Sequence, residues 1–145
     1  NAAVPDLAKL LPNPQLSSWA RIALEAIPGP AADEALRRAM RKLDGRLLVG
    51  VINSIGVRRD EGAVVALVQR LKDSDADVAS AAAVALGRVG NVRATRALEQ
   101  SFADAQGSVR SDVARAIILS AERRLADGNA AEAVRLYDKI RTAQG

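Results

Sequence analysis

Residues 73–90 read DSDADVASAAAVALGRVG, and this stretch decides the fold. Three acidic residues open it, and together with Ser74 they supply the chemistry of a turn and a helix N-cap. The alanine-rich run that follows lets a helix pack closely against its neighbours. Gly90 and Asn91 then provide a C-terminal stop. The stretch therefore predicts one closely packed helix with defined ends.

This pattern recurs along the chain with a period of 31 residues. Four columns of small or aliphatic residues share the period: Leu16, Leu47, Val78 and Val109; Ala20, Val51, Ala82 and Val113; Ala23, Ser54, Ala85 and Ala116; Leu24, Ile55, Leu86 and Ile117. Two shorter columns share it as well: Leu36, Leu67 and Leu98; Met40, Leu71 and Phe102. A fixed period of this length is typical of a protein built from stacked repeats.

Each repeat contains two helices. The first helical stripe follows the spacing i, i+4, i+7, i+8, i+11: Leu16, Ala20, Ala23, Leu24 and Ile27. The other helix is clearest in residues 63–71, and no segment alternates with the period of a strand. One pair of short helices cannot bury its own apolar face, so neighbouring pairs must stack. We predict an all-α fold, an α-solenoid of antiparallel helix pairs in a right-handed superhelix of about eight or nine helices.

Residues 73–90 resemble the short bacterial HEAT repeat found in phycobilisome-lyase-like proteins. They show its acidic turn and its V-x-x-x-A-A-x-A-L-G-x-x-G helix, and residues 104–117 match more loosely. The resemblance spans residues 4–120, although Glu25 replaces the glycine of the leading unit. It implies a HEAT-like solenoid in which the second helix of each unit lines the concave surface. Such motifs specify a fold better than a function.

The two ends of the chain depart from the repeat. Asn1 and Ala2 have the composition of a tag remnant, which indicates a piece of a longer polypeptide. Residues 3–120 form the HEAT-like repeats, and residues 121–145 form a C-terminal capping helix of the same structural domain. Residues 128–137 resemble the G-x-x-x-E-A-x-x-x-Y run of a tetratricopeptide repeat. We expect Val134, Tyr137 and Ile140 to face the last repeat.

The composition excludes several kinds of chemistry. The chain has no cysteine and no histidine, which removes thiolate catalysis, imidazole catalysis and the usual zinc ligands. The acidic cluster at residues 73–77 lacks the glycine and the bidentate glutamate of a calcium loop, so it indicates helix capping. Ser54 and Ser120 have no evident base. We therefore predict no enzymatic activity, no cofactor and no metal site.

The net charge of +4, with 17 arginines among 21 basic residues, raises the alternative of a nucleic-acid module that holds the DNA backbone. The positions that we expect on the concave face carry few arginines, whereas a phosphate-binding groove needs several. Nucleic-acid binding is therefore disfavoured. A second alternative, an accessory or lyase-type HEAT protein, has only Arg21, Glu25 and Asp112 to offer at the centre of the groove.

We expect the concave face to expose an apolar patch that binds a partner. Three columns define this face: Ser17, Leu48, Ala79 and Arg110; Ser18, Val49, Ser80 and Ser111; Arg21, Ile52, Ala83 and Ala114. The candidate binding residues are Leu48, Val49, Ile52 and Asn53, flanked by Arg21 and Arg110. Asn53 has a second possible role as a hydrogen-bonded tie between repeats. Alternatively, repeat curvature or another domain buries the patch. Aspartate at Leu48 and Ile52 is expected to abolish partner binding without unfolding the domain.

The function predicted from the sequence is a non-catalytic interaction or scaffolding module of a larger protein. Its partner is expected to be a protein or peptide segment, or another domain of the parent chain. The longest apolar run is too short to span a membrane, so we expect no membrane partner and a soluble domain. We also expect the isolated domain to be monomeric. The sequence leaves the cellular compartment open.

Overall fold

The computed structural model describes residues 1–143, and these residues form nine α-helices and one short 3-10 turn without any strand. The elements in chain order are α1 (Val4–Leu10), α2 (Ser17–Ala26), α3 (Pro30–Lys42), α4 (Gly45–Arg58), the turn η1 (Glu61–Ala63), α5 (Val64–Arg70), α6 (Ala76–Val89), α7 (Val92–Asp104), α8 (Gly107–Ala126) and α9 (Ala130–Ala143). The all-α solenoid predicted from the 31-residue period is confirmed.

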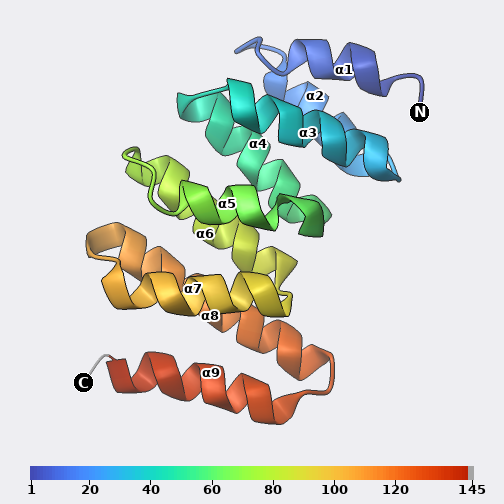
Figure 1. The fold of residues 1–145 in the computed structure, drawn as a ribbon. Helices are drawn as coiled ribbons and strands as arrows, with labels where there is room; N and C mark the ends of the chain where they lie inside the picture. The colour runs from blue at the N-terminus through green and yellow to red at the C-terminus, as the bar shows by residue number, and fades with distance from the viewer. Residues whose placement is uncertain (144–145) are drawn as a thin grey trace.

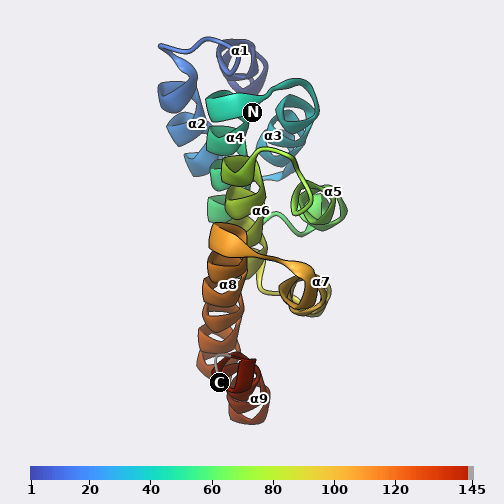
Figure 2. The ribbon, with the colours of Figure 1, turned by 90° about the vertical axis from the view of Figure 1, so that its left-hand side faces the viewer.

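The helices stack in two layers from one end of the molecule to the other (Figure 1). Figure 2 shows α2, α4, α6 and α8 in one layer and α3, α5 and α7 in the other. We call these the inner and outer helices. The two chain ends lie at opposite ends of the stack.

Short polar residues and glycines set the helix ends. The Asp75 side chain accepts a hydrogen bond from the backbone N–H of Asp77 at the start of α6. The Asn91 side chain accepts one from Ala94 at the start of α7. Gly90 ends α6 with a φ of 62°, a left-handed conformation that glycine adopts without strain.

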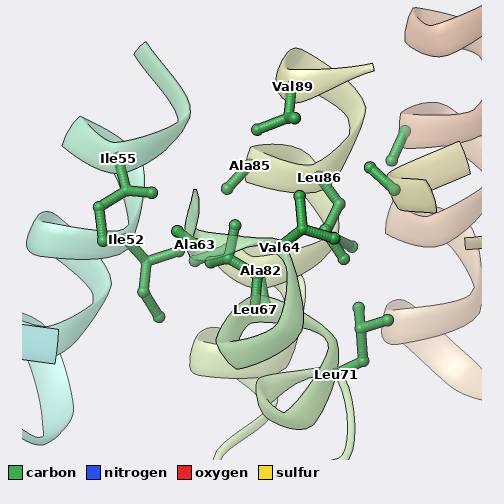
Figure 3. Packing of buried hydrophobic residues seen from close by; sticks show 14 of the residues in the cluster. Ile52, Ile55, Ala63, Val64, Leu67, Leu71, Ala82, Ala85, Leu86 and Val89 are labelled. Carbon is green, nitrogen blue, oxygen red and sulfur yellow. The ribbon is translucent and has the colours of Figure 1, made fainter. Parts of the chain in front are cut away.

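The repeat columns form the core. Leu24, Ile55, Leu86 and Ile117, one column of the repeat, are each 0% exposed. Figure 3 shows how α5 contributes to this core: Val64 and Leu67 lie beside Ala82 and Leu86 of α6, with Ile52 and Ile55 of α4 on one side and Leu71, which follows α5, on the other. Burying an aliphatic side chain of this size stabilises the fold by about 1.5–3 kcal/mol, so these columns supply most of the driving force for stacking.

Glycines allow neighbouring inner helices to approach closely. A Cβ atom at Gly56 would lie 2.9 Å from the Cα of Ala85, and one at Gly87 would lie 2.8 Å from the backbone oxygen of Ala116. In the leading unit Glu25 occupies the glycine position, and its carboxylate accepts a 2.6 Å hydrogen bond from the Ser54 hydroxyl. A polar contact therefore replaces the glycine contact between α2 and α4.

The C-terminal helix packs on α8 through a different face from the one expected. Ala133, Leu136 and Ile140 are buried, whereas Val134 is 56% exposed and Tyr137 is 37% exposed. The prediction is correct for Ile140 and wrong for the other two. Leu136 and Ile140 lie one helical turn apart on the same stripe, and Tyr137 is rotated about 100° away from Leu136.

Candidate functional site: the inner-helix groove

A groove of about 700 Å³ crosses the inner layer, and we call it the inner-helix groove. Its walls come from α2, α4, α6 and α8 and from Asp75 in the loop that precedes α6. It is lined by Arg21, Gly45, Arg46, Val49, Gly50, Asn53, Asp75, Asp77, Ser80, Ala81, Val84, Ser108 and Asp112. Its volume exceeds the roughly 420 Å³ of a hollow whose lining comes largely from the ends of α6 and α8.

The 31-residue repeat itself builds this groove. Arg46, Val49 and Asn53 lie on one face of α4, because residues at i, i+3 and i+7 share a helix face. The equivalent residues one repeat later, Asp77, Ser80 and Val84, lie on the same face of α6. The groove is therefore a stack of equivalent helix faces in which each repeat contributes different side chains.

The two ends of the groove carry opposite charges. Arg21 and Arg46 lie at the end formed by α2 and α4, and Asp75, Asp77 and Asp112 lie at the end formed by α6 and α8.

Arg21 and Asp112 each make polar contacts at the groove wall. Arg21 donates from one guanidinium nitrogen to the Gly50 oxygen at 3.1 Å and to the Ser54 hydroxyl at 3.3 Å. A Cβ at Gly50 would meet this guanidinium at 2.7 Å, so the small residue makes room for it. Asp112 pairs with Arg115 at 3.1 Å.

Two of the residues predicted to bind a partner belong to the core. Leu48 is 2% exposed and Ile52 is 0% exposed, so neither offers a docking surface. The prediction places Leu48 and Ile52 on the exposed face of α4, whereas the residues one position later, Val49 and Asn53, line the groove. One position along a helix corresponds to a rotation of about 100°, which explains the difference. Aspartate at either position would bury a charge in the core, so the structure predicts that these substitutions destabilise the fold, contrary to the expectation from the sequence.

Arg110 also lies away from the groove. Its guanidinium sits 4.0 Å from the centre of the Phe102 ring and donates a hydrogen bond to the Phe102 backbone oxygen. The other three candidates, Arg21, Val49 and Asn53, do line the groove. No hydrogen bond ties the Asn53 side chain to another of residues 1–143, so its amide is free to meet a ligand.

Sequence reasoning missed Arg46, Asp77 and Val84 as groove residues, whereas Ser80 and Asp112, which it places on the concave face and at the groove centre, do line the groove. A signal was present, because one column of the repeat is polar in every unit: Gln15, Arg46, Asp77 and Ser108. A polar column marks the solvent side of stacked helices more reliably than a column of alanines, which fits a buried or an exposed face equally well. Trp19 is 72% exposed and does not line the groove, although its column continues through Gly50, Ala81 and Asp112, which do.

Several arginines outside the groove cap the C-termini of other helices. Arg58 is the fullest case, because its guanidinium donates to the backbone oxygens of Leu24, Glu25, Ile27 and Gly29. Arg70 donates to the Met40 oxygen at the end of α3, and Arg124 to the Gly90 oxygen at the end of α6. Cations at helix C-termini satisfy unpaired carbonyls and oppose the negative end of the helix dipole. Part of the positive charge therefore has a structural role.

The serine and the acidic cluster considered in the sequence as catalytic or metal-binding candidates have other surroundings in the structure. Ser54, which contacts Glu25 and Arg21, is 0% exposed and thus closed to a substrate. Residues 1–143 contain no group of acidic residues arranged to hold a metal ion. The acidic cluster acts in capping: the backbone N–H of Asp75 and the Arg70 guanidinium hold the pKa of Asp73 below its ordinary value. None of the helices formed by residues 1–143 has the length and apolar character needed to cross a membrane.

The two-layer stack of helix pairs and the groove across its inner layer define the class of α-solenoid repeat proteins. Within that class, the sequence matches the family described as HEAT repeats over residues 42–118, which is more than half of the chain. The chain belongs to the HEAT-repeat family. No curated protein matches the sequence. HEAT repeats commonly mediate protein–protein interaction, and the family is typically a non-catalytic scaffold.

Proposed function

We propose that this chain is a non-catalytic interaction module of a larger protein, and that it binds a segment of a protein partner in the inner-helix groove. The observation that carries the proposal is the groove itself, an open hollow of about 700 Å³ with apolar, amide, hydroxyl and charged groups on its walls. Such a mixture suits a peptide, which presents backbone hydrogen-bonding groups together with apolar and charged side chains.

The charges in the groove favour a peptide over nucleic acid. Three carboxylates, those of Asp75, Asp77 and Asp112, line the groove beside only two guanidinium groups. A phosphate backbone would be repelled along half of this surface, because affinity for nucleic acid comes from neutralising phosphates with lysine and arginine. The acid and base candidates of an accessory-enzyme role, Glu25 and Arg21, are engaged by Ser54 and Gly50.

The test is a selection from a random peptide library against the folded domain. One double variant, Asn53→Trp with Ser80→Trp, fills the groove with two indole rings. A matched control, Val65→Trp with Gln69→Trp, places the same rings on the outer helix α5, where both positions are exposed. Circular dichroism confirms that both variants keep their helices.

Peptides that the wild type selects should bind the outer-helix control with unchanged affinity and the filled-groove variant at least tenfold more weakly. The proposal fails if no peptide is enriched, or if the enriched peptides bind the filled-groove variant equally well. Groove-dependent binding of duplex DNA, with an affinity that falls steeply as salt rises, would instead support the nucleic-acid alternative.

A further inference from the structure

The inner-helix groove has a direction, because its charges are separated along the stack. The guanidinium groups of Arg21 and Arg46 belong to α2 and α4, and the carboxylates of Asp77 and Asp112 belong to α6 and α8. Arg46 and Asp77 are exposed, and neither forms an ion pair with another of residues 1–143. Among residues 1–143, Asp112 pairs only with Arg115, which is 77% exposed, and such exposed pairs exchange at little cost.

The middle of the groove offers apolar surface and hydrogen-bonding groups. Val49 and Val84 provide aliphatic surface, while Asn53 and Ser80 provide an amide and a hydroxyl. Val84 also lines a second hollow of about 300 Å³ between α6 and α8, whose walls include Ile118 and Leu119. This hollow therefore offers a binding site for an apolar side chain of a peptide that lies near Val84.

The helix spacing sets the scale of the occupant. Packed helices lie about 8–10 Å apart, so the two steps from α4 to α8 cover about 16–20 Å. An extended chain advances about 3.3 Å per residue, and about five or six residues cover this distance. A short linear segment is thus long enough to reach both charged ends.

We propose that the inner-helix groove recognises a peptide segment by its charge order: an acidic residue at the α2–α4 end, an apolar residue in the middle and a basic residue at the α6–α8 end. This rests on the proposed function, since it specifies what the groove binds. A segment in this orientation places a carboxylate against Arg21 and Arg46 and a cation against Asp77 and Asp112. The reversed segment brings like charges together at both ends.

The experiment repeats the peptide selection with a groove whose charges are exchanged. The variant Arg46→Glu with Asp77→Lys reverses one charge at each end and keeps the net charge of the chain. The control Arg93→Glu with Glu34→Lys makes the equivalent charge reversals on the outer helices α7 and α3. Both positions are exposed and form no ion pair among residues 1–143. Affinities are measured by the fluorescence of labelled peptides at low and at physiological salt.

Peptides selected by the wild-type domain should share the acidic, apolar and basic order. They should bind the control variant with unchanged affinity and the charge-exchanged variant at least tenfold more weakly. Synthetic peptides with their acidic and basic residues interchanged should then prefer the exchanged groove. In a contrary result, the enriched peptides lose affinity for the filled-groove variant and yet bind the charge-exchanged variant as tightly as the wild type. That result overturns the charge-order proposal while the proposed function stands. If no groove-dependent peptide is found, both are overturned.

Discussion

At the scale of single residues, glycine determines how closely the inner helices pack. The backbone of Ala116 lies so near Gly87 that a Cβ atom there would overlap its oxygen and its Cα, at 2.8 Å and 3.0 Å. Gly50 is also crowded, but its neighbour is the end of the flexible Arg21 side chain, which can shift at the cost of its hydrogen bonds to the Gly50 oxygen and the Ser54 hydroxyl. Backbone crowding and side-chain crowding should therefore have different energetic consequences.

Gly87→Ala should lower the free energy of unfolding by about 1–2 kcal/mol, because the strain of overpacking exceeds the gain of about 1 kcal/mol in helix propensity. Gly50→Ala serves as the matched control in a helix of the same layer and should be close to neutral. Urea denaturation followed by circular dichroism measures both. Equal stability changes in the two variants would refute this account of helix approach.

The boundary between core and groove also lies at single residues. Leu48→Asp should destabilise the domain by about 4 kcal/mol or more, since it removes a buried aliphatic side chain and buries an unpaired charge. Asn53→Asp, on the exposed face of the same helix, should change stability by less than about 1 kcal/mol. Thermal melts distinguish the two variants, and a fully folded Leu48→Asp protein would place Leu48 outside the core.

At the scale of helices, long-range side-chain contacts fix the ends of elements. The Arg58 guanidinium reaches from the end of α4 to the last carbonyls of α2 and also pairs with Asp33 of α3. One side chain therefore ties three helices together. Its side chain is only 9% exposed, so water does not replace these hydrogen bonds when they are lost.

Arg58→Met should lower the free energy of unfolding by about 2–4 kcal/mol, because it leaves several carbonyls and the Asp33 carboxylate without a partner. Arg141→Met is the matched control, since the Arg141–Asp138 pair is largely exposed and should contribute less than about 1 kcal/mol. Chemical denaturation at neutral pH measures the difference. Similar costs for the two variants would contradict the capping role of Arg58.

Helix α9 is tied to α7 by ion pairs that depend on pH. Hydrogen bonds from Arg135 and Lys139 hold the pKa of Glu99 below its ordinary value of 4.5. A lowered folded-state pKa means that the carboxylate stabilises the fold above the unfolded-state pKa, and that this contribution is lost as the pH falls through the folded-state value.

Glu99→Gln should therefore be less stable than the wild type by about 1 kcal/mol at pH 7, and this gap should close as the pH falls below 4.5. Urea denaturation at a series of pH values measures it. The matched control is Glu34→Gln, at an exposed carboxylate without an ion pair among residues 1–143, and it should change the stability at pH 7 by less than about 0.5 kcal/mol. A stability difference between the wild type and Glu99→Gln that grows as the pH falls would contradict this role of the ion pairs.

At the scale of the whole molecule, the sequence predicts the stack better than the surface. The 31-residue columns identify core residues such as Leu24 and Ile55, because burial in every repeat imposes the same residue type. The groove face is harder to predict, since alanines such as Ala79 and Ala83 fit a buried or an exposed position. The arginine caps leave no local pattern, because Arg58 meets carbonyls more than 28 residues away in sequence.

The central claim is that a partner segment occupies the inner-helix groove, and thiol footprinting tests it most directly. The chain has no cysteine, so single cysteines introduced by Asn53→Cys in the groove and Val65→Cys on α5 report one position each. A peptide selected by the wild type should slow thiol modification at position 53 at least tenfold and leave position 65 unaffected. Equal rates at position 53 with and without saturating peptide would contradict the claim.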